Sequence, residues 1–92
     1  MAEEQMRRTR SAWRPDDIVA YEEMRDLAVA AQDILIARAR RDVSQAAART
    51  EAARLRHETL AIDGFDRKAV DEHTRRLALR LTELRIGERD RD

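Results

Sequence analysis

The sequence contains no cysteine, one proline and only two glycines among its 92 residues. Disulfide bonds are therefore excluded, and long stretches contain nothing that would interrupt a helix. Aromatic residues are equally scarce, with one tryptophan, one tyrosine and one phenylalanine, so a single copy has little material for a large core. Because chains this short are marginally stable without help, we expect this one to assemble with itself or with another protein.

Long hydrophobic runs are also missing. The most apolar window, residues 27–37, is interrupted by Gln32 and Asp33 and is too short to cross a bilayer. No apolar segment follows the charged N-terminus, as one would in a secretory signal peptide. We therefore expect a cytoplasmic protein without membrane contact, and the absence of cysteine agrees with a reducing compartment.

The charges balance overall but are segregated along the chain. Nineteen basic and 19 acidic residues give a formal net charge of zero, which argues against a surface devoted entirely to nucleic acid. Residues 16–26 nevertheless carry five acids and one arginine, whereas residues 38–56 carry six arginines and two acids. This segregation keeps nucleic-acid binding open as an alternative function.

The stretch between Pro15 and Gly64 contains no other proline or glycine and is rich in alanine, arginine, glutamate and leucine. Proline suits the first position of a helix, and the acids at 16 and 17 suit the positive end of the helix dipole. We predict a helix over residues 16–62, which would be about 70 Å long if it is continuous.

Apolar residues along the first half of this helix recur at alternating spacings of three and four, as in a coiled coil. Between residues 27 and 37 the helix is apolar over most of its circumference, and a two-helix monomer cannot bury such a surface. We therefore predict a partner or oligomer interface formed by Tyr21, Met24, Leu27, Ala28, Ala31, Ile34, Leu35 and Ile36.

The apolar pattern shifts by one residue at Ile36 and continues through alanine-rich positions to Leu60. One explanation is a continuous helix that presents one face to its own chain and another to a second subunit, which we favour because no glycine or proline intervenes. The alternative is a break within residues 41–44, with Asp42 as the cap and Gln45 closing a capping box.

A turn is predicted at residues 63–66, where Gly64 suits a left-handed helix cap and Asp66 suits the N-cap of the next helix. That helix is predicted over residues 67–86, with Gly87 ending it and a solvated tail at 88–92. Its expected apolar positions are Val70, Thr74, Leu77, Leu81 and Leu84.

Folding the chain back at residue 65 places Ala53 opposite Leu77 and Ala46 opposite Leu84, so that small residues face large ones. The sequence thus predicts an all-α protein with one domain, residues 15–87. We expect a coiled-coil-like helical hairpin, a long helix with a shorter antiparallel one, that assembles into an oligomeric helical bundle.

Residues 1–14 form a polar arm without periodicity, which we expect to be flexible or ordered by a partner. Its arginines and those of residues 38–56 suit contact with phosphate, and a dimer would double this basic stripe. The candidate nucleic-acid contacts are Arg7, Arg8, Arg10, Arg38, Arg41, Arg49 and Arg56.

Gly64-Phe65-Asp66, followed by Lys68-Ala69-Val70, is similar to the hinge of a bacterial nucleoid-associated coiled-coil family that clamps DNA. The resemblance covers only this short part of the chain. The resemblance implies DNA binding, but the lysine-rich second helix of that family is absent here, with Asp71 and Glu72 in its place.

No spacing of nucleophile and base or of phosphate-binding glycines is present, and we expect no catalytic residues and no cofactor. The predicted hairpin brings His57 opposite His73, yet neither lies at a helical metal-binding spacing, so we expect no metal site. The sequence favours a non-enzymatic protein–protein interaction module. Such a module would be an adaptor, an inhibitor-type regulator or a small subunit of a bacterial or phage assembly.

Overall fold

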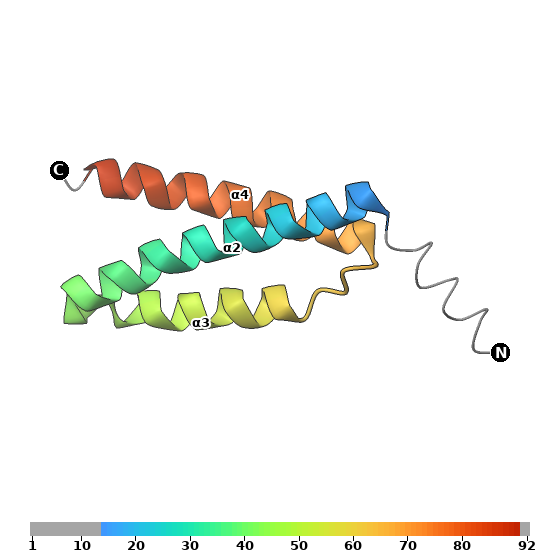
Figure 1. Ribbon diagram of the computed structural model, residues 1–92. Coiled ribbons are helices and arrows are strands. Elements are labelled where there is room, and N and C mark those ends of the chain that lie inside the picture. The colour runs from blue at the N-terminus through green and yellow to red at the C-terminus, as the bar shows by residue number, and fades with distance from the viewer. Residues whose placement is uncertain (1–13, 91–92) are drawn as a thin grey trace.

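The computed structural model describes residues 14–90, which form three α-helices (Figure 1). Helix α2 spans Pro15–Arg41, α3 spans Ala46–Leu60 and α4 spans Arg67–Asp90, with a 3-10 turn, η1, at Val43–Gln45. No strand occurs in this range, so the predicted all-α class is confirmed. None of these helices combines the length and the apolar character that crossing a membrane would require.

Helix α2 lies at the centre of the arrangement and packs against both other helices (Figure 1). Helix α3 runs back along α2, and α4 then runs in the same direction as α2. The predicted two-helix hairpin is therefore corrected to a three-helix bundle, whose principal-axis extents are 57 × 19 × 14 Å. Helix α3 is the shortest and stops before the start of α2, so the first turns of α2 extend beyond it (Figure 1).

The predicted continuous helix over residues 16–62 is wrong, because the chain breaks at Asp42. This residue has an extended backbone (φ −148°, ψ 115°), and its side chain accepts a hydrogen bond of 2.9 Å from the Ser44 backbone N–H. The Asp42 N–H closes α2 on the Arg38 carbonyl oxygen at 3.2 Å. Asp42 therefore offers the backbone partners that a break requires, and the break allows α3 to cover the apolar surface of α2.

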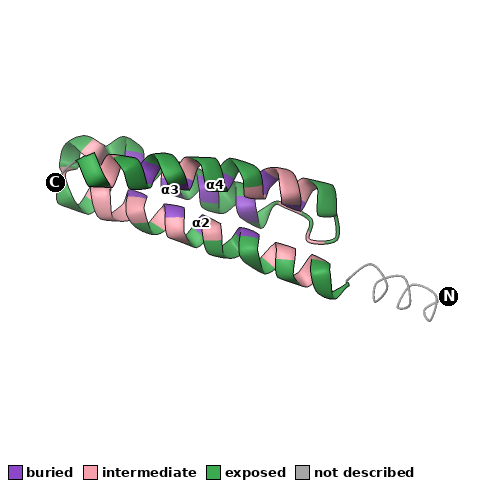
Figure 2. Cartoon of the chain, turned by 90° about the horizontal axis from the view of Figure 1, so that it is seen from above, coloured by how far each residue is buried: buried purple, intermediate pink, exposed green. Residues whose placement is uncertain are grey.

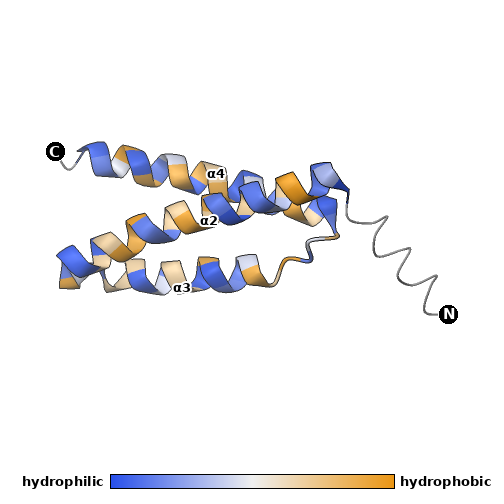
Figure 3. Cartoon of the chain, viewed as in Figure 1, coloured by the Kyte–Doolittle hydropathy of each residue, from blue (hydrophilic) through white to orange (hydrophobic). Residues whose placement is uncertain are grey.

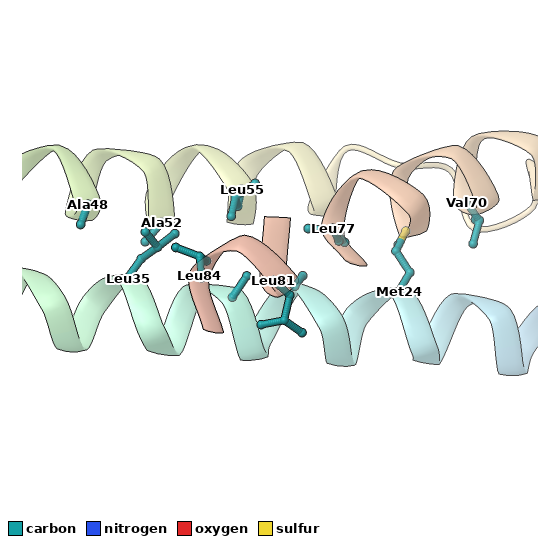
Figure 4. Close-up of a cluster of buried hydrophobic side chains, with 11 residues drawn as sticks. Met24, Leu35, Ala48, Ala52, Leu55, Val70, Leu77, Leu81 and Leu84 are labelled. Atoms are coloured by element: carbon teal, nitrogen blue, oxygen red, sulfur yellow. The ribbon is translucent and has the colours of Figure 1, made fainter. Parts of the chain in front are cut away.

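The core contains side chains from all three helices. On α2 the buried positions follow the predicted three/four spacing at Met24, Ala28, Ala31 and Leu35. Figure 4 shows Met24 and Leu35 rising from α2 toward residues contributed by α3 and α4. Buried positions face one another between the helices and exposed positions lie outside (Figure 2). The remaining core residues are Ala48, Ala52, Leu55, Val70, Leu77, Leu81 and Leu84.

The stripe predicted for the α3 region is wrong. Ala46 and Ala53 are exposed and Leu60 is 59% exposed, whereas the buried positions of α3 are Ala48, Ala52, Leu55 and Thr59. The prediction assumed that the helical periodicity continues unchanged through Asp42 and η1. The extended residue and the tighter 3-10 turn instead rotate the side chains that follow, so different residues of α3 face α2. The pairing about residue 65 therefore fails, since it rested on the exposed alanines.

Helix α4 begins as predicted, because the Asp66 side chain accepts a hydrogen bond of 3.1 Å from the Ala69 N–H. The predicted left-handed cap at Gly64 is wrong, since no glycine in residues 14–90 has a positive φ. Along α4, Thr74 is half-buried and donates back to the Val70 carbonyl oxygen at 2.8 Å. The neighbouring residue His73 is buried in the core instead of Thr74.

The end of α4 also differs from the prediction, because the helix continues through Gly87 to Asp90 and includes part of the expected tail. The Arg38 guanidinium lies over Gly87, where an added Cβ would meet Nη2 at 2.7 Å. Arg38 donates to the Leu84 carbonyl oxygen at 2.9 Å and to the Glu88 carboxylate at 3.0 Å. These contacts fix the last turns of α4 to α2.

Truncation of a core leucine tests this packing. We expect Leu84→Ala, at a position with 0% exposure, to lower the free energy of unfolding by about 2–5 kcal/mol in urea denaturation. The matched change Leu79→Ala, at a position that is 65% exposed, is expected to cost less than about 0.5 kcal/mol. Equal losses at the two positions would contradict the packing described above.

Candidate interaction surface

The outward face of α2 carries a stripe that neither α3 nor α4 covers completely. We call it the outer stripe, and its residues recur at spacings of three and four: Ile18, Glu22, Arg25, Val29, Asp33, Ile36 and Arg40. At 100° per residue these positions fall within an arc of about 80°, centred roughly 140° from Met24. Val29 is 51% exposed, and the two isoleucines are partly exposed. Figure 3 shows hydrophobic and hydrophilic residues interspersed along α2.

Two adjoining hollows lie along the outer stripe. The first is where α2 extends beyond α3, and it is lined by Ile18, Tyr21, Glu22, Arg25 and Asp26. The second lies between α2 and α3 and is lined by Arg25, Ala28, Val29, Gln32, Arg56, Thr59 and Leu60. Both hollows include Arg25, and we call the two together the furrow. Its two most exposed apolar side chains come from different helices, Val29 from α2 and Leu60 from α3.

The charged groups of the outer stripe form no ion pairs in the part of the chain that the structure describes. In residues 14–90, Glu22, Asp33 and Arg40 form no ion pair or side-chain hydrogen bond, and Arg25 only stacks on the Tyr21 ring at 5.9 Å. Elsewhere the bundle does pair its charges across helices. The outer stripe thus combines exposed apolar side chains with charges that are available to a partner.

The charges that join the helices lie on other faces. Arg67 donates to Asp17 at 2.9 Å, which joins the starts of α2 and α4. Arg80 holds Glu51 through two contacts of 2.6 and 2.8 Å, which join α3 to α4. This hydrogen-bonded Arg80 guanidinium lowers the pKa of the Glu51 carboxyl below its usual value.

The residues predicted to form a partner interface lie mostly inside the bundle. Met24, Ala28, Ala31 and Leu35 are buried by the chain's own α3 and α4, and Leu27 and Ile34 pack against this core. A third helix within the same chain supplies the cover that the sequence assigned to a partner. Tyr21 and Ile36 are only partly buried, Tyr21 in the first hollow and Ile36 on the outer stripe.

The predicted nucleic-acid contacts that the structure describes lie on α2 and α3. Arg38 and Arg41 each form an ion pair with Glu88 at 3.0 Å, so this one carboxylate offsets part of the positive charge of both arginines. Arg49 and Arg56 are exposed on α3 and have no ion pair among the described residues. Arg7, Arg8 and Arg10 lie outside the described residues.

A polar cluster links α3 to α4 around the buried His73. Its Nδ1 accepts from Arg76 at 3.3 Å, because a guanidinium can only donate, and its Nε2–H then donates to the Thr59 hydroxyl oxygen at 2.8 Å. The distance would suit a nucleophile and a base, but Thr59 is 3% and His73 is 2% exposed. Each side chain therefore satisfies the other between α3 and α4, while Thr59 also lines the second hollow and His73 lines a third one with Glu58 and Arg76.

The two histidines do not come together as the hairpin predicted, because His57 is exposed and His73 is buried. In the range 14–90 no group of three histidine or carboxylate side chains is placed to hold a metal ion.

Sequence reasoning missed the outer stripe because its charged members conceal the apolar period. The signal was available in Ile18, Val29 and Ile36, which repeat at spacings of 11 and seven residues.

Comparison of the chain with protein-family models, curated proteins and solved structures gave no match. We therefore infer function from the residues and geometry of the outer stripe and the furrow.

The polar cluster makes stability depend on pH. Burial lowers the pKa of His73, and the neighbouring Arg76 lowers it further, while Glu58 acts in the opposite direction. The folded state thus favours neutral His73, and stability is fully present above the ordinary histidine pKa of about 6.5. As the pH falls below that value, protons bind the unfolded chain first and the free energy of unfolding decreases, until the folded-state pKa is reached.

We expect urea denaturation between pH 7.5 and pH 5 to show this decrease for the natural chain. The variant His73→Gln should lose the dependence, whereas His57→Gln, which changes an exposed histidine, should retain it. A decrease that follows His57 instead would contradict the role given to the buried cluster.

Proposed function

We propose that this chain acts as a protein–protein interaction module whose docking surface is the outer stripe of α2 together with Leu60 of α3. The observation that carries the proposal is the second hollow of the furrow, in which the exposed Val29 and Leu60 lie together beside Arg25. Isolated exposed apolar residues are normal on protein surfaces. Here two helices place such residues together in a hollow, which is typical of a site that a helix occupies.

The composition of this surface supports binding to protein. Interfaces commonly have an apolar centre and a polar rim that fixes the orientation of the partner. Val29 and Leu60 supply such a centre, and Glu22, Arg25, Asp33 and Arg40 supply both signs of charge around it. An adaptor, an inhibitor-type regulator or a small subunit of a larger assembly would use the surface in the same way, without chemistry of its own.

The test is photocrosslinking in the cells that produce the protein. A benzophenone amino acid at Leu60 is expected to give discrete protein adducts, because that side chain lies at the centre of the furrow. The same probe at Leu79, which is 65% exposed on α4 and lines neither hollow, is the control. Equal or absent adducts from both positions would refute the proposal, and the mass of the adduct identifies the partner.

Nucleic-acid binding is the second candidate, favoured by the exposed and unpaired Arg49 and Arg56. These residues are one heptad apart and hence lie on the same side of α3. This function predicts binding to duplex DNA that weakens steeply with salt. Replacing both arginines by glutamine should then reduce the salt dependence by about two ions, measured by fluorescence anisotropy. No binding at low salt would exclude this candidate and leave the first untouched.

A further inference from the structure

We propose that the partner of the outer stripe is a second copy of this chain, packed antiparallel on α2 about a twofold axis at Val29. This inference rests on the proposed function, since it names the occupant of the same surface. It follows from the order of residues along the stripe, which is Ile, Glu, Arg, Val, Asp, Ile, Arg. A twofold contact requires charges that meet their opposites when the surface is reversed, and Arg25 and Asp33, four residues on either side of Val29, meet this requirement.

The register follows from helix geometry. When two copies of a helix lie antiparallel with Val29 facing Val29, residues whose numbers sum to 58 face one another. Arg25 of each copy then faces Asp33 of the other, so opposite charges meet twice. Glu22 faces Ile36 of the second copy and lies one turn from its Arg40. Ile18 faces Arg40 of the second copy. Glu22, Arg25, Asp33 and Arg40 are exposed, and none of them forms an ion pair in residues 14–90.

A parallel arrangement fails on the same residues. Each position would meet its own copy, so that Arg25 would oppose Arg25 and Asp33 would oppose Asp33. Like charges placed directly opposite are destabilising. Charge therefore selects the antiparallel orientation, and this selection does not depend on the apolar residues.

The apolar residues agree with the position of the axis. Val29 is central in the stripe, and Leu60 of α3 lines the same hollow as Val29. The twofold axis thus brings the two most exposed apolar residues of the furrow next to their counterparts. The stripe from Ile18 to Arg40 is about 33 Å long and narrow, which predicts a small interface and a dimer that depends on concentration.

The experiment is sedimentation equilibrium of the purified full chain and of charge-reversed variants. The natural chain is expected to rise from 10.7 kDa toward twice that mass as concentration increases. Arg25→Glu and Asp33→Arg should each weaken association at least tenfold, because each puts like charges together on both sides of the axis. An equimolar mixture of these two variants should associate again, since opposite charges then meet at both places.

The double variant Arg25→Glu/Asp33→Arg separates pairing from net charge, because its formal charge is again zero. It should restore the homodimer, and a contact within one chain cannot explain that result, since these residues are two turns apart on one helix. Circular dichroism checks that every variant keeps its helices. Leu79→Glu, on the outer side of α4, should leave association unchanged.

Three results would overturn the inference: a natural chain that stays monomeric up to about 1 mM, folded single variants that still associate, or a mixture and a double variant that do not recover. If the natural chain is monomeric while the probe at Leu60 captures a different protein, the inference fails and the proposed function stands. If neither a dimer nor an adduct forms, both fail.

Discussion

Burial of one stripe of α2, from Met24 to Leu35, is the contact on which the rest of the fold depends. A single helix of about 40 Å cannot stay folded on propensity alone, so α2 requires cover along its apolar side. Helix α3 provides it with small residues, Ala48 and Ala52, which allow two helices to approach closely while adding little apolar area. Helix α4 compensates with leucines and completes the core from the other side. The break at Asp42 is a consequence of this requirement, because only a reversal of the chain places α3 on α2.

Much of this could be predicted from the sequence, and the wrong hairpin, the wrong stripe of α3 and the wrong pairing about residue 65 share one cause. The periods of α2 and α4 were readable because each helix keeps one phase from start to end, as Met24, Leu35, Leu77 and Leu84 show. The pattern of α3 was misread because one extended residue at Asp42 rotates everything that follows. No glycine or proline lies near that residue. The only sequence signal for a break is that an aspartate side chain can accept a hydrogen bond from a nearby backbone N–H, and this signal is weak within a long stretch of helix-forming residues. The wrong phase in α3 led to a predicted hairpin that needed a partner, whereas residues 14–90 form a bundle of three helices.

The same error misplaced the candidate site. Once α3 and α4 cover the most apolar side of α2, the available surface is the weaker, mixed pattern on its third side. Positive and negative charges also balance on that side, where acids and arginines alternate along one face instead of pairing across the bundle. A balanced pattern of this kind suits a contact in which the charges select the orientation of the partner and a small apolar centre supplies the attraction.

Gly87 shows how a single missing side chain can join two distant parts of a chain. A glycine inside a helix costs about 1 kcal/mol relative to alanine, yet here its bare backbone gives the Arg38 guanidinium room to reach the Leu84 carbonyl oxygen. Position 87 thus lies against a residue 49 positions earlier. An added side chain there would displace only the end of the Arg38 side chain, so its effect would fall on the hydrogen bond between Arg38 and Leu84 and not on the backbone of either helix.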